Sequence, residues 1–158
     1  LIDSFSMVCK KSDTLTIVGD GPLMDILKNK VAKLEIANNI VFLGHLDSDA
    51  LGIEYLNHQT LVLPSDREVW GLVVNEALHH GLPCIVSQAV GSAPDLIKPG
   101  ITGNIFETNS VDSLAKTIED SLYLCNNSEI QKQCQLQVSN YSVQKAAEGI
   151  AQAYSSLC

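Results

Sequence analysis

Short apolar runs alternate along the chain with longer stretches in which apolar residues recur every three or four positions. The short runs are rich in β-branched residues and stop at glycine, proline or serine, as buried strands do. The longer stretches are typical of helices that cover one face of a sheet. The pattern predicts strands over residues 14–19, 40–44, 60–63, 83–87 and 104–106.

Helices are predicted in the intervals between these strands. Pro22 suits the first turn of one of them, and Gly81 is placed to close another. From residue 110 onward the pattern is mostly helical to the end of the chain. The remaining helices are expected over residues 1–11, 23–34, 46–56 and 71–80.

Strands that alternate with helices in this way imply parallel strands joined by right-handed crossovers. We therefore expect an α/β fold, a Rossmann-like doubly wound parallel sheet flanked by helices. The chain opens on a helical pattern with no strand ahead of it, so we expect one domain, residues 1–158, whose first strand lies upstream. Ligands of such sheets bind beyond the carboxyl ends of the strands, here the loops 19–22, 44–46, 64–71 and 87–94.

Composition and charge exclude several classes of function. Hydrophobic residues make up 46% and charged residues 18%, and no apolar run approaches the ~20 residues of a membrane span. A net charge of −8 argues against nucleic acid and against an anionic membrane surface as partners of this domain. Residues 1–10 lack the pattern of a signal peptide. The five cysteines have no C-x2-C spacing, so we interpret them as reduced thiols of a cytoplasmic protein, with no metal site.

The densest group of candidate functional residues lies between residues 64 and 83, PSDREVWGLVVNEALHHGLP. A strand ends before it, a short loop carries Glu68, and Gly71 opens a helix that carries Glu76. A helix N-terminus at this edge has unpaired N–H groups and the positive end of a dipole, which suits a diphosphate. Gly71 lets the backbone come close, and the two carboxylates flank that position as acceptors for hydroxyl groups.

Glu68 to Glu76 forms the E-x7-E motif of retaining glycosyltransferases with two facing Rossmann-like domains, the GT-B fold. The segment resembles the group-1 family pattern P-S-x-x-E-x-[FW]-G-x-x-x-x-E-A-[ML]-x-x-G-x-P at every fixed position. Further similar segments are IVGDGP (17–22), VFLG (41–44), GSAPD (91–95) and GITG (100–103). Ser92 and Asp95 stand where this family usually has Gly and Glu, which leaves the backbone shape there open.

The resemblance implies a role for each candidate residue. Glu76 would bind the ribose of the donor nucleotide, and Glu68 would act as the catalytic residue facing the donor sugar. The N–H groups of Gly71 and Leu72 would hold the diphosphate, stabilising its negative charge without a metal or other cofactor. Residues near the base and the phosphates would include Leu46, Gly19, Gly21, Ser65 and Trp70, although packing is the favoured interpretation for the indole.

The function that the resemblance implies is that of the donor-binding domain of a retaining glycosyltransferase. Such enzymes move a sugar from a nucleotide-sugar to an acceptor, commonly in bacterial surface polysaccharide or glycolipid synthesis, in the cytoplasm or at the inner face of the membrane. The acceptor domain and an Arg and a Lys that the family places upstream are absent, so we expect the isolated chain to be inactive. A sugar-nucleotide 2-epimerase and a non-catalytic binding module stay open as alternatives.

Other polar residues have simpler interpretations. Asp47-Ser48-Asp49 matches a D-x-D metal motif, but Asp and Ser just ahead of a helix are preferred capping residues, and capping is what we expect. The pair His79-His80 is expected to be structural or exposed, and Lys10 and Lys11 to be solvated. His45 follows Gly44 at the predicted binding edge, where contact with the nucleotide and an ordinary surface position both stay open.

Overall fold

The computed structural model describes residues 1–157 of the chain. Every predicted strand forms, each within one residue of its predicted bounds. Glycine, proline or serine lies at or next to most of the strand ends, which explains why the sequence locates them so closely. The strands are β1 (Leu15–Val18), β2 (Ile40–Gly44), β3 (Leu61–Leu63), β4 (Cys84–Ser87) and β5 (Gly103–Phe106).

The predicted helices also form, with one addition. The unpredicted helix α5 (Ala93–Leu96) has Pro94 in its first turn and is too short to show a helical period in the sequence. Two short 3-10 segments, η1 (Ala37–Asn39) and η2 (Leu122–Leu124), complete the set. The other helices are α1 (Ile2–Val8), α2 (Met24–Val31), α3 (Ser48–Asn57), α4 (Leu72–His79), α6 (Val111–Ser121), α7 (Ser128–Ser139) and α8 (Val143–Leu157).

The strands are all parallel, as predicted, but they form two sheets where one continuous sheet was expected. β1 pairs with β2, while β4 lies between β3 and β5. No ladder joins β1 to β3 among the described residues. In the classic doubly wound order 3-2-1-4-5-6, the central strand would occupy the position between these two sheets.

The three-stranded sheet is covered on both faces. Side chains alternate along β4, so that Cys84 and Val86 face one core cluster while Ile85 faces another. The first cluster lies under α3, α4, α5 and α7, and the second under α6, which explains why all of β4 is buried. The largest fully buried side chains include Leu78, Ile85, Leu96 and Leu124.

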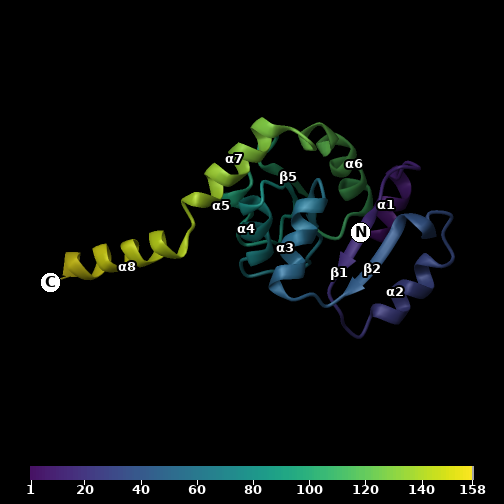
Figure 1. The fold of residues 1–158 in the computed structure, drawn as a ribbon, viewed down its shortest axis with the longest axis horizontal. Coiled ribbons are helices and arrows are strands. Elements are labelled where there is room, and N and C mark those ends of the chain that lie inside the picture. The colour runs from purple at the N-terminus through teal and green to yellow at the C-terminus, as the bar shows by residue number, and fades with distance from the viewer. Residues whose placement is uncertain (158) are drawn as a thin grey trace.

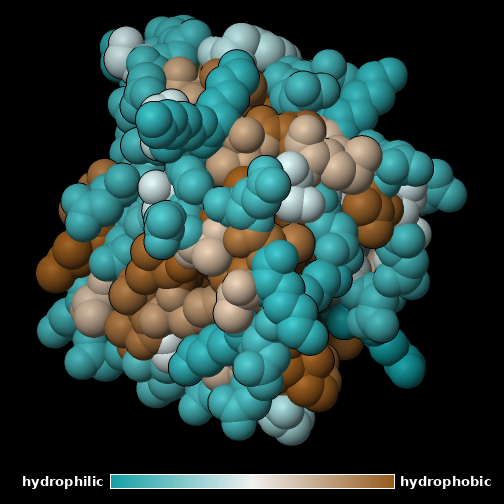
Figure 2. Space-filling model, turned by 90° about the vertical axis from the view of Figure 1, so that its right-hand side faces the viewer, coloured by the Kyte–Doolittle hydropathy of each residue, from teal (hydrophilic) through white to brown (hydrophobic). Residues whose placement is uncertain are grey.

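The two-stranded sheet has a core of its own. Ile40 and Phe42 of β2 pack with Ile2 and Phe5 of α1 and with Val31 of α2. Helix α1 also packs against α6, so it connects this sheet to the second face of the three-stranded sheet (Figure 1). The alternate side chains of β2, Val41 and Leu43, are exposed, and Figure 2 shows apolar side chains among polar ones on this side of the molecule.

Helix α8 extends away from the body of the molecule (Figure 1). None of its described residues is buried, yet apolar side chains recur along it at helical spacing. The most exposed of them are Val143, Ile150, Tyr154 and Leu157. No helix within residues 1–157 has the length and the apolar character needed to cross a membrane.

Four cysteines within the described residues are free thiols, as predicted. Burial raises the pKa of Cys84 well above its usual range and that of Cys134 to about 12, so both are neutral core residues. Cys158 lies outside the described residues.

Asp47 caps α3, as the sequence predicts. Its Oδ1 accepts a hydrogen bond from the Ala50 amide at 2.9 Å. We expect Asp47→Ala to lower the free energy of unfolding by about 1 kcal/mol, because a helix N–H loses its acceptor. Asp47→Asn keeps the acceptor oxygen and should stay close to the wild type. Urea denaturation measures both, and equal losses in the two variants would contradict the capping role.

Candidate functional site

The loop after β3 and the start of α4 form the centre of the candidate site. Gly71 lies between them with a φ of 86°, and a Cβ there would approach Leu63, Glu68 and Val90 to 3.2–3.3 Å. Both the left-handed backbone and the close packing therefore require glycine. The first backbone bond of α4 runs from the Val74 amide to the Gly71 carbonyl at 2.9 Å. Among the described residues, the amides of Gly71 and Leu72 have no hydrogen-bond partner, which leaves them free for a ligand.

Backbone hydrogen bonds hold this loop against the loop that follows β4. The Glu68 amide donates to Ala89 at 3.3 Å, and the Glu68 carbonyl accepts from Gly91 at 3.0 Å. Two residues further, the Ser92 amide donates to the Trp70 carbonyl at 3.1 Å. Glu68 therefore lies in a segment whose backbone is hydrogen-bonded on one side, much as a β-strand is.

Two further side chains fix the loop. The Ser87 hydroxyl donates to the Ser65 carbonyl, which ties the start of the loop to the end of β4. The Glu68 carboxylate accepts from the Trp70 amide at 3.4 Å and is partly buried. Ser65 therefore takes part in the site through its backbone, while Glu68 keeps its carboxylate beside the start of α4.

Trp70 is engaged in packing. Its Nε1 donates to Asn75 Oδ1 at 2.8 Å, and its ring lies 6.2 Å from that of Tyr141. The indole also packs on the core cluster under α4. These contacts agree with the packing interpretation of this residue.

Glu76 lies on the exposed side of α4, and its carboxylate has a partner that sequence reasoning missed. The hydroxyl of Tyr55, on α3, donates to Glu76 Oε2 at 2.9 Å. Burial raises the pKa of Tyr55 strongly, and the hydrogen bond to Glu76 adds to this, so the phenol keeps its proton. The sequence did carry a signal for this contact. Tyr55 lies in a predicted helix with a buried face, and a buried tyrosine hydroxyl needs a hydrogen-bond partner.

The remaining candidates lie at the carboxyl ends of β1 and β2. Gly19 donates its amide to the Gly44 carbonyl at 2.7 Å, which joins the two loops. The Gly21 amide donates to Asp20 Oδ1 at 2.7 Å. Leu46 is partly buried just before α3. The structure therefore groups the predicted residues in two sets, one on each sheet.

Ser92 and Asp95, which replace the usual Gly and Glu of the family pattern, do not disturb the backbone. Ser92 has a φ of −79°, which any residue adopts, so a second glycine is not required there. Its side chain is fully buried, and its hydroxyl has no partner among the described residues. Asp95 accepts a hydrogen bond from the Tyr141 hydroxyl at 3.3 Å.

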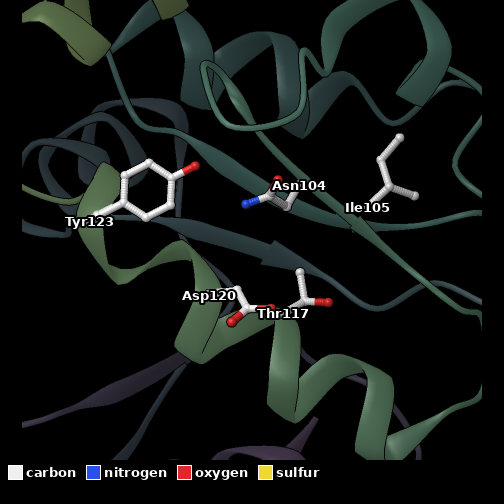
Figure 3. A pocket seen from close by; sticks show the side chains of 5 residues that line it. All are labelled: Asn104, Ile105, Thr117, Asp120 and Tyr123. Carbon is white, nitrogen blue, oxygen red and sulfur yellow. The ribbon is translucent and has the colours of Figure 1, made fainter.

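A cavity of about 280 Å³, shown in Figure 3, has none of these residues in its lining. It is lined by Asn104, Ile105, Thr117, Asp120 and Tyr123, from β5, α6 and η2. The Asn104 amide already donates to Ser121 at 2.9 Å and accepts from Gly100 at 3.1 Å. Asn104 and Ile105 are the two central residues of β5, so the cavity lies beside the middle of the strand and not at its carboxyl end.

Solved structures share this fold. The chain superimposes on Anabaena HepE, solved in complex with UDP, with a TM-score of 0.84 and 25% identity, covering 99% of this chain and 44% of HepE. A glycosyltransferase from Rickettsia africae gives a TM-score of 0.85 and 21% identity over 98% of this chain and 42% of its own. These neighbours are GT-B glycosyltransferases, which confirms the predicted fold.

Residues 1–135 match the family of glycosyl transferases group 1. N-acetyl-alpha-D-glucosaminyl L-malate synthase of Bacillus anthracis is 31% identical over 134 residues, 84% of this chain. A sulfoquinovosyl transferase of Arabidopsis thaliana is 34% identical over 112 residues, 69% of this chain. The chain therefore belongs to the group-1 glycosyltransferase family. It spans 33% and 21%, respectively, of the lengths of these two relatives.

We expect Gly91→Ala to disrupt the loop that carries Glu68. A Cβ at this position would lie 1.9 Å from the Val69 carbonyl oxygen, so the two paired loops would have to separate. The free energy of unfolding should fall by about 1–3 kcal/mol, measured by urea denaturation. Gly149→Ala is the matched control, because nothing lies within 4 Å of its Cβ position on α8, and it should be neutral or stabilising. Equal effects of the two changes would contradict this account.

Proposed function

We propose that this chain is the donor-binding domain of a retaining glycosyltransferase that transfers a sugar from a nucleotide-sugar to an acceptor. The observation that carries the proposal is the start of α4, where the free amides of Gly71 and Leu72 lie beside the Glu68 carboxylate. The likeness to HepE, a protein solved with UDP and with UDP-glucose, supports a nucleotide-sugar as the ligand.

In this proposal, residues of the α4 region each bind a different part of the nucleotide-sugar donor. The amides of Gly71 and Leu72 bind the diphosphate, whose negative charge grows as the bond to the sugar breaks. Hydrogen-bond donors fixed in place at a helix N-terminus stabilise that charge without reorganising, so the reaction needs no metal ion. Glu68 faces the donor sugar, and Glu76 binds the ribose hydroxyls.

The second set of residues completes the donor site. Leu46 lies against the base, and the loop containing Gly19 and Gly21 borders the phosphates. The acceptor binds to a further domain of the full-length protein, because this chain spans a third or less of the relatives described above. A parallel strand from upstream of Leu1 would fill the position between β1 and β3 and join the two sheets.

The wider role in this proposal is the synthesis of a bacterial surface polysaccharide or a glycolipid. The full-length protein would work in the cytoplasm, or bound to the inner face of the membrane through parts other than this domain. The net charge of −8 supports membrane binding through other parts of the protein, because a negatively charged domain is repelled by anionic lipid.

Titration with UDP, GDP and ADP, with and without magnesium, tests the donor site. We expect one nucleotide to bind selectively and independently of magnesium. Glu76→Ala should weaken that binding by about 1–3 kcal/mol, because a hydrogen bond from the ribose to a charged acceptor is lost. Glu119→Ala, which removes an exposed glutamate on α6, is the matched control and should bind like the wild type. Unchanged affinity in Glu76→Ala would favour a binding module without this chemistry.

Steady-state kinetics of the full-length protein test the reaction. We expect transfer of a sugar to an acceptor, and a loss of about 100-fold in kcat for Glu68→Gln with little change in KM, because its charge acts in the transition state. Glu119→Gln should keep full activity. Residues 1–158 alone should show no transfer, since they lack the acceptor domain. Turnover by this chain alone, or epimerised sugar released with UDP from UDP-GlcNAc without acceptor, would overturn the proposal.

A further inference from the structure

Tyr55 connects helix α3 to the carboxylate of Glu76 on helix α4. Its ring is buried in the core cluster with Val74, Ala77 and Leu78, and only 7% of the residue is exposed. Its hydroxyl reaches out of this cluster to Glu76 Oε2 at 2.9 Å. An exposed carboxylate is therefore anchored by a side chain whose own position is fixed by core packing.

The direction of this hydrogen bond is determined by chemistry. An ionised carboxylate only accepts, so the phenol must donate. Burial and the neighbouring carboxylate both raise the pKa of Tyr55, which keeps the donor proton in place at neutral and alkaline pH. The interaction therefore occupies one oxygen of Glu76. Oε1, the other oxygen, has no partner among the described residues.

His80, the residue directly after α4, supports the same arrangement. Its ring lies 5.1 Å from the Tyr55 ring, and its Nδ1 is 2.8 Å from the Glu76 carbonyl oxygen. A carbonyl oxygen accepts, so Nδ1 carries the proton. The imidazole is thus fixed to the backbone of Glu76 while it packs on the phenol that holds the Glu76 side chain.

A glutamate on a helix surface otherwise samples several rotamers, and a ligand that fixes it must overcome that entropy. We propose that Tyr55 is a positioning residue for the donor nucleotide: it holds Glu76 Oε2 so that Oε1 is directed to the ribose hydroxyls. The inference rests on the proposed function and adds a residue that acts through Glu76 without touching the nucleotide.

The test compares Tyr55→Phe with the wild type in the full-length protein by calorimetric titration. The ligands are the nucleoside diphosphate that binds best among UDP, GDP and ADP, and its 2′,3′-dideoxy counterpart. We expect Tyr55→Phe to weaken the intact nucleotide about three- to tenfold, as the loss of one hydrogen bond does. The dideoxy nucleotide, which has no hydroxyl for Glu76, should bind both proteins equally.

Two further variants separate positioning from packing. Tyr123→Phe removes an exposed tyrosine hydroxyl in η2, at the cavity of Figure 3, and should bind both nucleotides like the wild type. In a Glu76→Ala background, Tyr55→Phe should have no additional effect on affinity, because its hydroxyl acts through the missing carboxylate. Melting temperatures of all variants report whether the core has changed.

Equal weakening of both nucleotides, or a further loss in the Glu76→Ala background, would overturn the inference and assign Tyr55 to packing alone. Unchanged affinity in Tyr55→Phe, with the wild type binding normally, would overturn it as well while leaving the proposed function in place. Failure of the wild type to bind any of the three nucleotides would overturn the proposed function and this inference together.

Discussion

The candidate site depends on the pairing between the loop after β3 and the loop after β4. Backbone hydrogen bonds join residues 68–70 to residues 89–92, and Gly91 lets the two segments approach more closely than any side chain would permit. The same pairing fixes the turn at Gly71 from which α4 starts, because Glu68 and Val90 surround that glycine. The free amides of α4 and the Glu68 carboxylate are therefore oriented by one backbone arrangement rather than by separate contacts.

The second constraint is the contact between α3 and α4. Three side chains of α4, Val74, Ala77 and Leu78, are fully buried in the core, so the exposed face of the helix has a fixed orientation. Tyr55 extends this rigidity from the core to the carboxylate of Glu76. Binding groups held by packing in this way need less ordering when a ligand arrives, which is the general benefit of a preorganised site.

Burial is distributed unevenly over the molecule. The three-stranded sheet is covered on both faces, whereas the two-stranded sheet has a smaller core and exposed apolar side chains on its other face. Helix α8 presents an apolar stripe and has no buried residue among those described. The well-packed part is the part that carries Glu68, Gly71 and Glu76, and the loops with Gly19 and Leu46 belong to the less enclosed sheet.

The amino-acid sequence alone predicts the strands and the main helices, the cap at Asp47 and the motif from Glu68 to Glu76, because these follow from residues close together in the chain. It missed α5, which is shorter than the helical period needs. The division of the sheet, the pairing of the two loops and the partner of Glu76 depend on contacts between distant parts of the chain. Tyr55 precedes that glutamate by 21 positions, and only the packing of α3 on α4 brings the two together. Local pattern encodes which face of an element is buried, but it does not encode what that face meets.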